Sequence, residues 1–281
     1  MIPPLFSPVQ FVIDAPFGRF TPSTNSIFLL DGVQAWILME LVAPIAFLYT
    51  LVNTPLATSP PDVAPLTPAP LFFAAIYLVH YANRALISPL RTPSRSKAHL
   101  SVTLSGIAFN IVNGTLLGTY LRSPTAAAFL SFNPLARPTF WVGTALWASG
   151  FVGNILHDEV LLNIRRNARA KGKARAKSPS PSSSKQQREH YGIPHGYLYA
   201  YVSYPNYFCE WVEWFGFALA AAPFPDVTSL GALVASVQPP WIFFFSEICL
   251  MIGRAYKGHQ WYLRNFADYP KDRRVVIPFV F

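Results

Sequence analysis

Cysteine and charged residues are both scarce in this chain of 281 residues. The two cysteines, Cys209 and Cys249, both lie within apolar stretches. They are too few for a disulfide framework or for a cysteine-based zinc site, and we expect no metal. Asp, Glu, Lys and Arg make up 12% of the residues, which is about half of the ~25% typical of soluble domains. This composition argues against a soluble globular fold.

The sequence also lacks the two common glycine-rich nucleotide motifs. No G-x-G-x-x-G follows a predicted strand, and no G-x-x-x-x-G-K-[ST] occurs. These motifs hold phosphates on backbone N–H groups at the start of a helix. A nucleotide site in this chain would therefore belong neither to a Rossmann fold nor to a P-loop fold.

Long apolar blocks are what the chain has instead, since 52% of its residues are hydrophobic. A helix needs about 20 apolar residues to cross a bilayer. We predict one all-α, membrane-embedded domain over residues 1–281, a bundle of about six spans, the last broken by Pro239 and Pro240. The expected spans are residues 27–52, 71–90, 99–121, 139–164, 196–222 and 229–253.

The basic residues gather on one side of these predicted spans. Nine lie between Arg165 and Arg188 and six between Arg254 and Arg274, whereas the loops of the other face hold only Arg122 and Arg137. Cytosolic loops carry an excess of Lys and Arg. We therefore expect both termini in the cytosol. Topology explains the formal charge of +9, and we expect no nucleic-acid partner.

Residues 168–187 are low in complexity, with Lys, Arg and Ala followed by Ser and Pro. Such a composition buries too little apolar surface to offset the loss of chain entropy on folding. We predict a disordered cytosolic loop inserted into the domain.

Polar residues recur on single faces of two predicted spans. Ionisable groups at membrane depth are costly unless they face the bundle interior, so they mark functional sites. An α-helix turns by about 100° per residue, so residues that are three, four or seven positions apart lie on the same face. Each of two sets of polar residues has these spacings. The sets are Asn154, Asp158 and Arg165 on the fourth span, and Asn206, Glu210 and Glu213 on the fifth.

These stripes have the chemistry of a nucleotide site. Amides and carboxylates can bond to ribose hydroxyls and to a carboxamide, and the forked guanidinium donors of Arg165, Arg254 and Arg273 suit phosphate oxygens. Two further residue pairs, Trp36 with Glu40 and Tyr81 with Arg84, each lie one turn apart on the first and second spans. A carboxyl group among apolar residues favours its protonated form. Protonated Glu40 and the phenol of Tyr81 could together donate to one carbonyl oxygen.

A series of motifs, in chain order, is similar to those of the steroid 5-alpha-reductase family. W-I-L-M-E-L at 36–41 resembles W-x-x-Q-E-L, and V-H-Y-A-N-R at 79–84 resembles V-H-Y-x-H-R. N-G at 113–114, G-N-I at 153–155, Y-G-I-P-H-G at 191–196 and N-Y-F-C-E at 206–210 follow. The tail from His259 to Arg273 matches H-x-W-Y-L-x-x-F-x-D-Y-P-K-x-R, with I-P-F after it.

This resemblance implies a seven-span membrane reductase of the endoplasmic reticulum that uses NADPH on a 3-oxo-Δ4 steroid, and the matches here begin near the second of the seven spans. It implies that Glu40 and Tyr81 hold the 3-oxo group, with Trp36 and Arg84 beside the substrate. The NADPH residues that it implies are Asn113, Asn154, Asp158, Arg165, Tyr191, Asn206, Glu210, Arg254, His259, Tyr262, Asp268 and Arg273. Met39 and Asn83 depart from the family pattern, which has Gln and His there.

We expect an oxidoreductase that adds hydride to the 5α carbon of a lipophilic steroid or sterol drawn from the membrane. A trans-2-enoyl-CoA reductase or a polyprenol reductase of the same superfamily is one alternative. An isoprenylcysteine-type methyltransferase is another, although it would not need Glu40 and Tyr81. The W-x-x-x-E-L and V-H-Y-x-x-R matches favour the steroid type.

Overall fold

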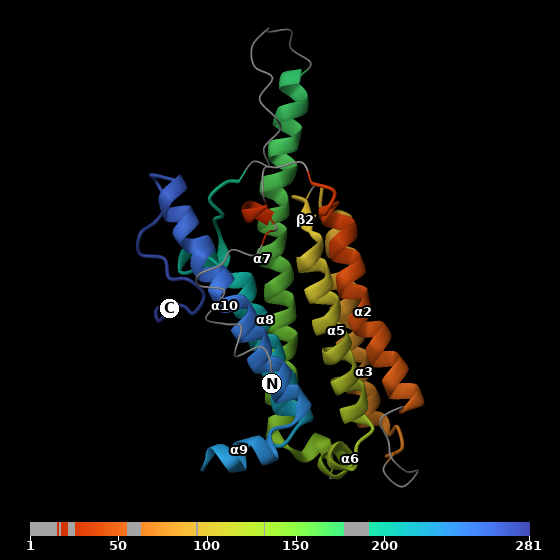
Figure 1. Ribbon diagram of the computed structural model, residues 1–281. Helices are drawn as coiled ribbons and strands as arrows, with labels where there is room; N and C mark the ends of the chain where they lie inside the picture. Colours follow the sequence, from red (N-terminus) through yellow and green to blue (C-terminus); the bar gives the residue numbers. More distant parts are fainter. Residues whose placement is uncertain are drawn as a thin grey trace.

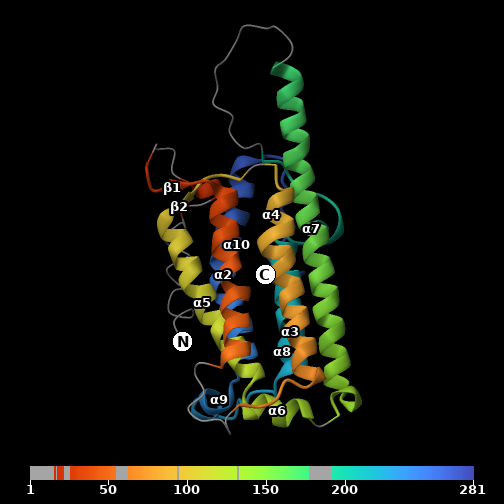
Figure 2. The same ribbon diagram turned by 90° about the vertical axis from the view of Figure 1, so that its right-hand side faces the viewer.

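The structure, a computed structural model, describes residues 16, 18–21, 26–54, 63–93, 95–131, 133–176 and 191–281. Their long helices form one elongated bundle (Figures 1 and 2). The long helices are α2 (Gly32–Asn53), α3 (Pro68–Tyr81), α5 (Leu100–Leu121), α7 (Pro138–Ala176), α8 (Pro205–Ala221) and α10 (Pro239–Asn265). The short ones are η1 (Gly18–Phe20), η3 (Ala82–Ile87), α4 (Ser88–Arg91), α6 (Pro124–Ser131), η4 (Pro134–Ala136), η5 (Tyr197–Ala200) and α9 (Leu230–Ser236).

Three stretches of the described chain are long and apolar enough to cross a membrane. They are Gly32–Asn53, Pro68–Arg91 and Leu100–Leu121, and the bent pair of α9 and α10 would be a fourth. The structure thus bears out a mostly helical protein with several candidate spans. The number of six spans and the cytosolic position of both termini stay predictions, because α7 and α8 are not among these stretches of the described chain.

Helix α2 begins five residues later than the first predicted span. Asp31 caps it, since its Oδ1 accepts from the N–H groups of Val33 and Gln34, both at 2.9 Å. A carboxylate at this position satisfies N–H groups that have no partner within the helix. The preceding strand β1 (Leu29–Leu30) pairs antiparallel with β2 (Ala98–His99).

The second predicted span is continuous but changes its winding at the centre. Residues 82–87 form a π-helical segment between α3 and α4, and the Ser88 N–H donates to the carbonyl oxygen of Asn83. A π-helical turn often marks a functional site because it shifts the side chains beyond it around the helix. Arg84 lies within this segment, three residues after Tyr81.

Helix α7 extends well beyond the other helices at one end of the bundle (Figure 1). It continues to Ala176, so the first nine residues of the loop that we predicted as disordered are helical. Their run of Ala, Lys and Arg consists of strong helix formers, which explains the extension. Residues 177–187 lie outside the described part of the chain.

The fifth and sixth predicted spans are each interrupted. A 3₁₀ turn and a bend occupy residues 197–204, and regular helix starts only at Pro205. Helices α9 and α10 meet at an angle of 114° at Pro239, where the sequence predicted the break. Figure 1 shows α9 and α6 lying across the end of the bundle opposite the α7 extension.

Glycine allows helices α7 and α8 to pack closely. A Cβ atom at Gly150 would overlap the backbone of Cys209 and Glu213. Small residues at helix contacts are typical of membrane proteins, where packing rather than water exclusion holds helices together. Gly114 serves the same purpose for α5 against Ala43 of α2.

The inside of the bundle is aromatic and its outside is apolar. Phe47 stacks on Tyr77 with ring centroids 4.1 Å apart, and the Trp214 ring lies 6.0 Å from Tyr77. On the outer face of α2, Ile45 is 64% exposed and Val52 is 67% exposed. Apolar residues in such positions suit contact with lipid tails.

Candidate active site

The six long helices surround a cavity of ≈ 490 Å³. It runs between α2, α3 and α5 on one side and α7, α8 and α10 on the other. Nine of the sixteen residues that the sequence singled out as site residues line it. They are Trp36, Glu40, Tyr81, Arg84, Asp158, Arg165, Asn206, Glu210 and Arg254.

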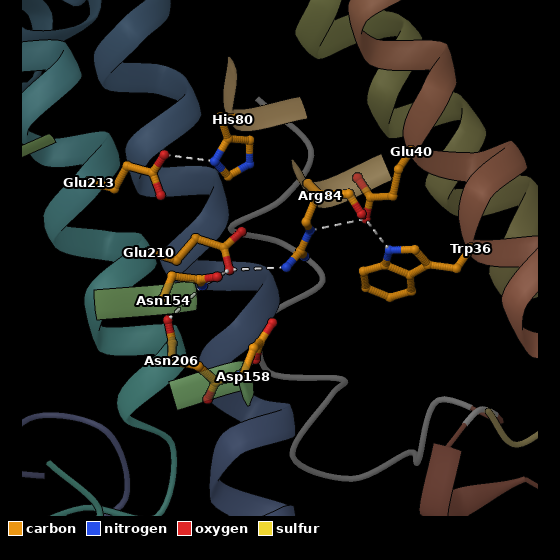
Figure 3. Close-up of polar contacts among 9 residues, drawn as sticks. All are labelled: Trp36, Glu40, His80, Arg84, Asn154, Asp158, Asn206, Glu210 and Glu213. Carbon is orange, nitrogen blue, oxygen red and sulfur yellow. Dashed lines mark hydrogen bonds and ion pairs between the residues drawn. The ribbon is translucent and has the colours of Figure 1, made fainter. Parts of the chain in front are cut away.

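Arg84 lies at the centre of the polar contacts in this cavity (Figure 3). Its Nη1 donates to Glu210 Oε2 at 3.2 Å, and its Nε lies 3.4 Å from Glu40 Oε1. The two carboxylates come from α8 and α2, so one guanidinium connects the two walls. The Arg84 carbonyl oxygen also accepts from Trp36 Nε1 at 3.2 Å.

The indole of Trp36 lies between two guanidinium groups. Arg84 is 4.8 Å from the ring centroid, and Arg95 is 3.9 Å from it. A cation over an aromatic face is attracted by the electron-rich ring. Trp36 therefore holds two cations at the cavity wall, and one of them, Arg95, is a residue that the sequence analysis did not single out.

Asn154 and Asn206 position the carboxylates of the two polar stripes. Asn154 Nδ2 donates to Glu210 Oε2 at 3.2 Å, and Asn206 Nδ2 donates to Asp158 Oδ1 at 3.0 Å. The stripes of α7 and α8 thus face each other, as their spacing predicts. Asn154 is buried behind Glu210 and does not line the cavity.

Asn113 lies behind Tyr81 rather than in the cavity wall. Its Nδ2 donates to the Tyr81 hydroxyl oxygen at 2.8 Å. Since Asn113 uses a lone pair of that oxygen, the Tyr81 O–H group remains able to donate elsewhere. Within the described chain, Asn113 therefore acts on the phenol and not on the cavity directly.

A second buried pair lies beside Tyr81. His80 Nδ1 is 2.7 Å from Glu213 Oε1, and Glu213 is fully buried. Figure 3 shows the imidazole between Glu213 and the cavity. His80 belongs to the motif at 79–84 and Glu213 to the stripe of the fifth predicted span, and helical spacing cannot relate one helix to the other.

The cationic side chains gather toward the basic end of the cavity. Arg95, Arg165 and Arg254 line it there. Guanidinium groups present forked donors that match phosphate oxygens. Amides and carboxylates lie further in, so the donor set of this wall fits a phosphorylated nucleotide.

Three of the remaining predicted cofactor residues, His259, Tyr262 and Arg273, form a separate group with Ser203 and Tyr269, which we call the tail cluster. The Ser203 hydroxyl lies 2.6 Å from both His259 Nδ1 and the Tyr269 hydroxyl. Tyr262 stacks on Tyr269 with centroids 5.0 Å apart. Burial raises the pKa of the Tyr269 phenol, which keeps it protonated.

Arg273 is the most buried cation of the tail cluster. It is 4% exposed and lies 5.0 Å from the Tyr269 ring centroid. Its Nε and Nη1 atoms have no hydrogen-bond partner among the described residues. Tyr191 is more peripheral and packs on Trp261 at 5.2 Å, and Asp268 is exposed.

Tyr204 connects the tail cluster to the cavity, whose wall it lines. The Tyr204 N–H donates to the Val275 carbonyl oxygen at 3.0 Å, and the Ser203 N–H donates to the Arg274 carbonyl oxygen at 2.9 Å. The C-terminal tail thus fixes the residues directly before α8. That helix carries Asn206 and Glu210 into the cavity.

Glu247 of α10 lines the cavity and was also missed. It is the only carboxylate of the sixth predicted span. The rule that ionisable residues at membrane depth mark functional sites could have found it. Its polar neighbour at helical spacing, Arg254, lies just beyond the end of the predicted span, so no polar stripe within the span marks it.

Comparison with known proteins shows which family this chain is similar to. A sequence profile of the 3-oxo-5-alpha-steroid 4-dehydrogenase family matches residues 96–281. The chain is 32% identical over 269 residues to 3-oxo-5-alpha-steroid 4-dehydrogenase 1 of Bos taurus, covering 96% of this chain and 89% of the relative. The chain belongs to this family.

Two other relatives extend the match over almost the whole chain. A steroid 5-alpha-reductase of Solanum lycopersicum is 30% identical over 288 residues, which cover 99% of this chain and 92% of the relative. An uncharacterized protein of Schizosaccharomyces pombe is 39% identical over 283 residues, covering 97% and 93%. The relatives with named activities are oxidoreductases, so membership of their family makes this chain an oxidoreductase.

Proposed function

We propose that this protein is an NADPH-dependent reductase that saturates the Δ4 double bond of a 3-oxo-Δ4 steroid or sterol. One observation carries the proposal: Glu40 and Tyr81 line the same cavity as the amide, carboxylate and guanidinium groups expected to hold a nucleotide. A carbonyl-binding group and a nucleotide-binding group are both needed for this reaction. The names of the relatives point to the same activity.

Glu40 and Tyr81 are proposed to donate to the 3-oxo group. The Tyr81 hydroxyl accepts from Asn113, so its own O–H can donate, either to the neighbouring Tyr77 hydroxyl or to a bound carbonyl. Polarising the carbonyl of an enone makes its β-carbon electrophilic, and that carbon is the 5α position of the steroid. A donor aimed at the oxygen is worth most when negative charge develops there.

Arg84 holds its two carboxylate partners differently. Glu210 accepts two hydrogen bonds, from Arg84 and from Asn154. Glu40 lies 3.4 Å from Arg84 and accepts no hydrogen bond from it. Glu40 is therefore the carboxyl group that is left to contact a substrate carbonyl.

NADPH would supply the hydride when bound. Arg95, Arg165 and Arg254 are placed to hold its phosphates at the basic end of the cavity, and Asn206, Asp158 and Glu210 lie further in. We assign Asn113 and Asn154 as positioning residues, because they bond to Tyr81 and to Glu210. The tail cluster and Tyr191 are proposed to support this end of the site through Tyr204.

A membrane location suits a lipophilic substrate, which can reach the bundle from the bilayer. We place the protein in the endoplasmic reticulum membrane by family resemblance. Neither the substrate nor the compartment is needed for the geometric part of the proposal.

The experiment is a conversion assay in membranes that contain the protein. They receive NADPH or NADH with a 3-oxo-Δ4 steroid, its 3-hydroxy-Δ5 counterpart or a long-chain enoyl thioester, and products are identified by mass. We expect the conjugated ketone to gain two hydrogens with NADPH, and the 3-hydroxy-Δ5 compound to stay unchanged. Reduction of the thioester alone would overturn the proposal in favour of an enoyl-CoA reductase.

A further inference from the structure

Glu247 is a fourth carboxylate in the cavity, besides Glu40, Asp158 and Glu210. It comes from α10, on the same face of the helix as Phe243 and Arg254. Arg254 lies seven residues further on, about 10 Å along the axis at 1.5 Å per residue. Glu247 therefore lies between the phosphate end of the cavity and its aromatic end, well inside from the cations.

Glu247 has no polar partner within the described chain. It makes no hydrogen bond or ion pair there, whereas Glu40 faces Arg84 and Glu210 is bonded to both Arg84 and Asn154. A carboxylate that has no partner in a helical bundle takes up a proton rather than bear an isolated charge. Glu247 lines the cavity, so the proton would be available there.

Several of the other ionisable groups around Glu247 are already paired with one another, which leaves Glu247 as the group that can carry a proton. Arg84 is matched by Glu210, and Glu213 is matched by His80 on the far side of the wall. The groups that face this region from the neighbouring elements are Glu40 on α2, His80, Tyr81 and Arg84 on α3 and η3, Asp158 on α7, Glu210 and Glu213 on α8, and Arg254 on α10. Arg84 is the cation whose charge acts on Glu247, and Glu210 already balances it.

Reduction of an enone needs a proton as well as a hydride. Glu40 and Tyr81 are assigned to the carbonyl oxygen and cannot at the same time protonate carbon. We propose that Glu247 is a catalytic acid that protonates the carbon next to the carbonyl. This inference rests on the proposed function, because it assumes that an enone is reduced in this cavity.

The step balances as follows. Hydride from the reduced nicotinamide brings two electrons to the β-carbon, and the electron pair of the double bond moves toward the carbonyl to give an enolate. The enolate returns to a ketone as its α-carbon takes the Glu247 proton and forms a C–H bond. Glu247 is left as a carboxylate near Arg84 and regains a proton from water after product release.

Glu247→Gln is the decisive variant, because glutamine keeps the size and hydrogen bonding of the side chain but has no proton to give. General acid catalysis contributes about 10²–10⁴-fold in rate. We expect Glu247→Gln to lower kcat by about 10²-fold or more, with the dissociation constant of NADPH unchanged. Glu247→Asp should recover part of the rate, and Glu159→Gln serves as a matched acid-to-amide control outside the cavity.

Two readouts separate an acid from a merely structural residue. In D₂O the wild type should place deuterium on one face of the α-carbon, and the product of Glu247→Gln should carry it on both faces, as NMR would show. Infrared difference spectra without substrate should show that Glu247→Gln removes the C=O stretch of a protonated carboxyl group.

The outcomes distinguish the two proposals. If the wild type reduces no enone, the proposed function fails. If the wild type reduces the enone, and Glu247→Gln does so at the same rate with the same single-face deuteration, Glu247 is not the acid. An infrared spectrum that is identical for wild type and Glu247→Gln would overturn the protonated state directly.

Discussion

The cavity and the tail cluster both consist of polar groups that match one family pattern, but they are held in different ways. In the cavity, side chains from different helices pair across the bundle, as Arg84 does with Glu210 at 3.2 Å, and other polar atoms still face open space. In the tail cluster, Ser203, His259 and Tyr269 bond to one another, and the backbone of the tail pairs with residues 201–204. We infer that the first region binds and reacts, and that the second positions the helix that carries Glu210.

The largest effect is expected for Glu40 in the cavity. One donor to a developing oxyanion is worth about 10²–10³ in rate, so Glu40→Leu should lower kcat by that factor. Glu40→Gln keeps an N–H donor and should retain part of the activity. Steady-state kinetics on membranes with equal protein content would measure this, and equal rates for Glu40→Leu and wild type would remove Glu40 from the mechanism.

Arg165 tests the cationic end of the same cavity. A hydrogen bond to a charged group contributes about 1.5–3 kcal/mol, so Arg165→Ala should raise the KM for NADPH on the order of ten- to a hundred-fold, with a smaller effect on kcat. The same assay with NADH should show a clear preference of the wild type for NADPH. Equal use of both nucleotides by the intact protein would contradict the phosphate assignment.

A substitution of Arg273 tests the difference between the cavity and the tail cluster. Arg273→Ala should also weaken NADPH affinity, but it should lower the thermal unfolding temperature without NADPH as well, because the buried guanidinium packs on Tyr269. Arg165 lines the cavity and is only half-buried, and its replacement should leave that temperature nearly unchanged. A loss of affinity with no loss of stability for Arg273→Ala would place it in the binding wall instead.

Ser203 should have a smaller effect still. Ser203→Ala removes a hydroxyl that bonds to both His259 and Tyr269. Leaving a buried polar group without its partner costs about 1–3 kcal/mol. We expect a lower unfolding temperature and a modest rise in the NADPH KM, with kcat retained. An unchanged unfolding temperature would show that these contacts do not hold the tail.

The smallest effect is expected for the Ser-rich insertion. Deleting Ser178–Gln186, which lie outside the described residues, should leave turnover nearly unchanged because no site motif falls there. A loss of activity at normal expression levels would show that this segment covers the nucleotide end of the site.

Helical periodicity predicted the polar stripes well and their partners not at all. The spacing of Asn154 with Asp158 and of Asn206 with Glu210 places each pair on one face of a helix, and the structure confirms that the two faces meet. The contact of Arg84 with Glu210 could not be predicted in this way. It depends on how η3 is wound and on how α3 packs against α8.

The predicted spans failed mainly at their ends. Hydropathy extended the first span to Ile27 because nothing in a hydropathy average registers the cap at Asp31. It ended the fourth span at residue 164, although the Ala, Lys and Arg that follow favour helix and α7 continues to Ala176. The break at Pro239 was predicted correctly, since proline cannot continue a helix from the preceding residue.

The sequence showed which residue types the family pattern requires. It did not show which of those residues line the cavity and which hold other residues in place. The family pattern placed Asn113, Arg165 and Arg273 in one set of nucleotide residues. In the structure only Arg165 lines the cavity. A motif indicates that a residue type is required at a position. Only distances in the structure tell whether that residue lines the cavity or positions another residue.

The most direct test of the central claim is the single-turnover rate of Tyr81→Phe with saturating NADPH and a 3-oxo-Δ4 steroid, measured together with the NADPH dissociation constant. The change removes the one hydroxyl that we propose as a donor to the carbonyl and leaves the ring in the core. We predict a rate lower by about 10²–10³ with an unchanged dissociation constant. A normal rate, or a loss that follows weakened NADPH binding, would contradict the assignment of Tyr81 to the substrate carbonyl.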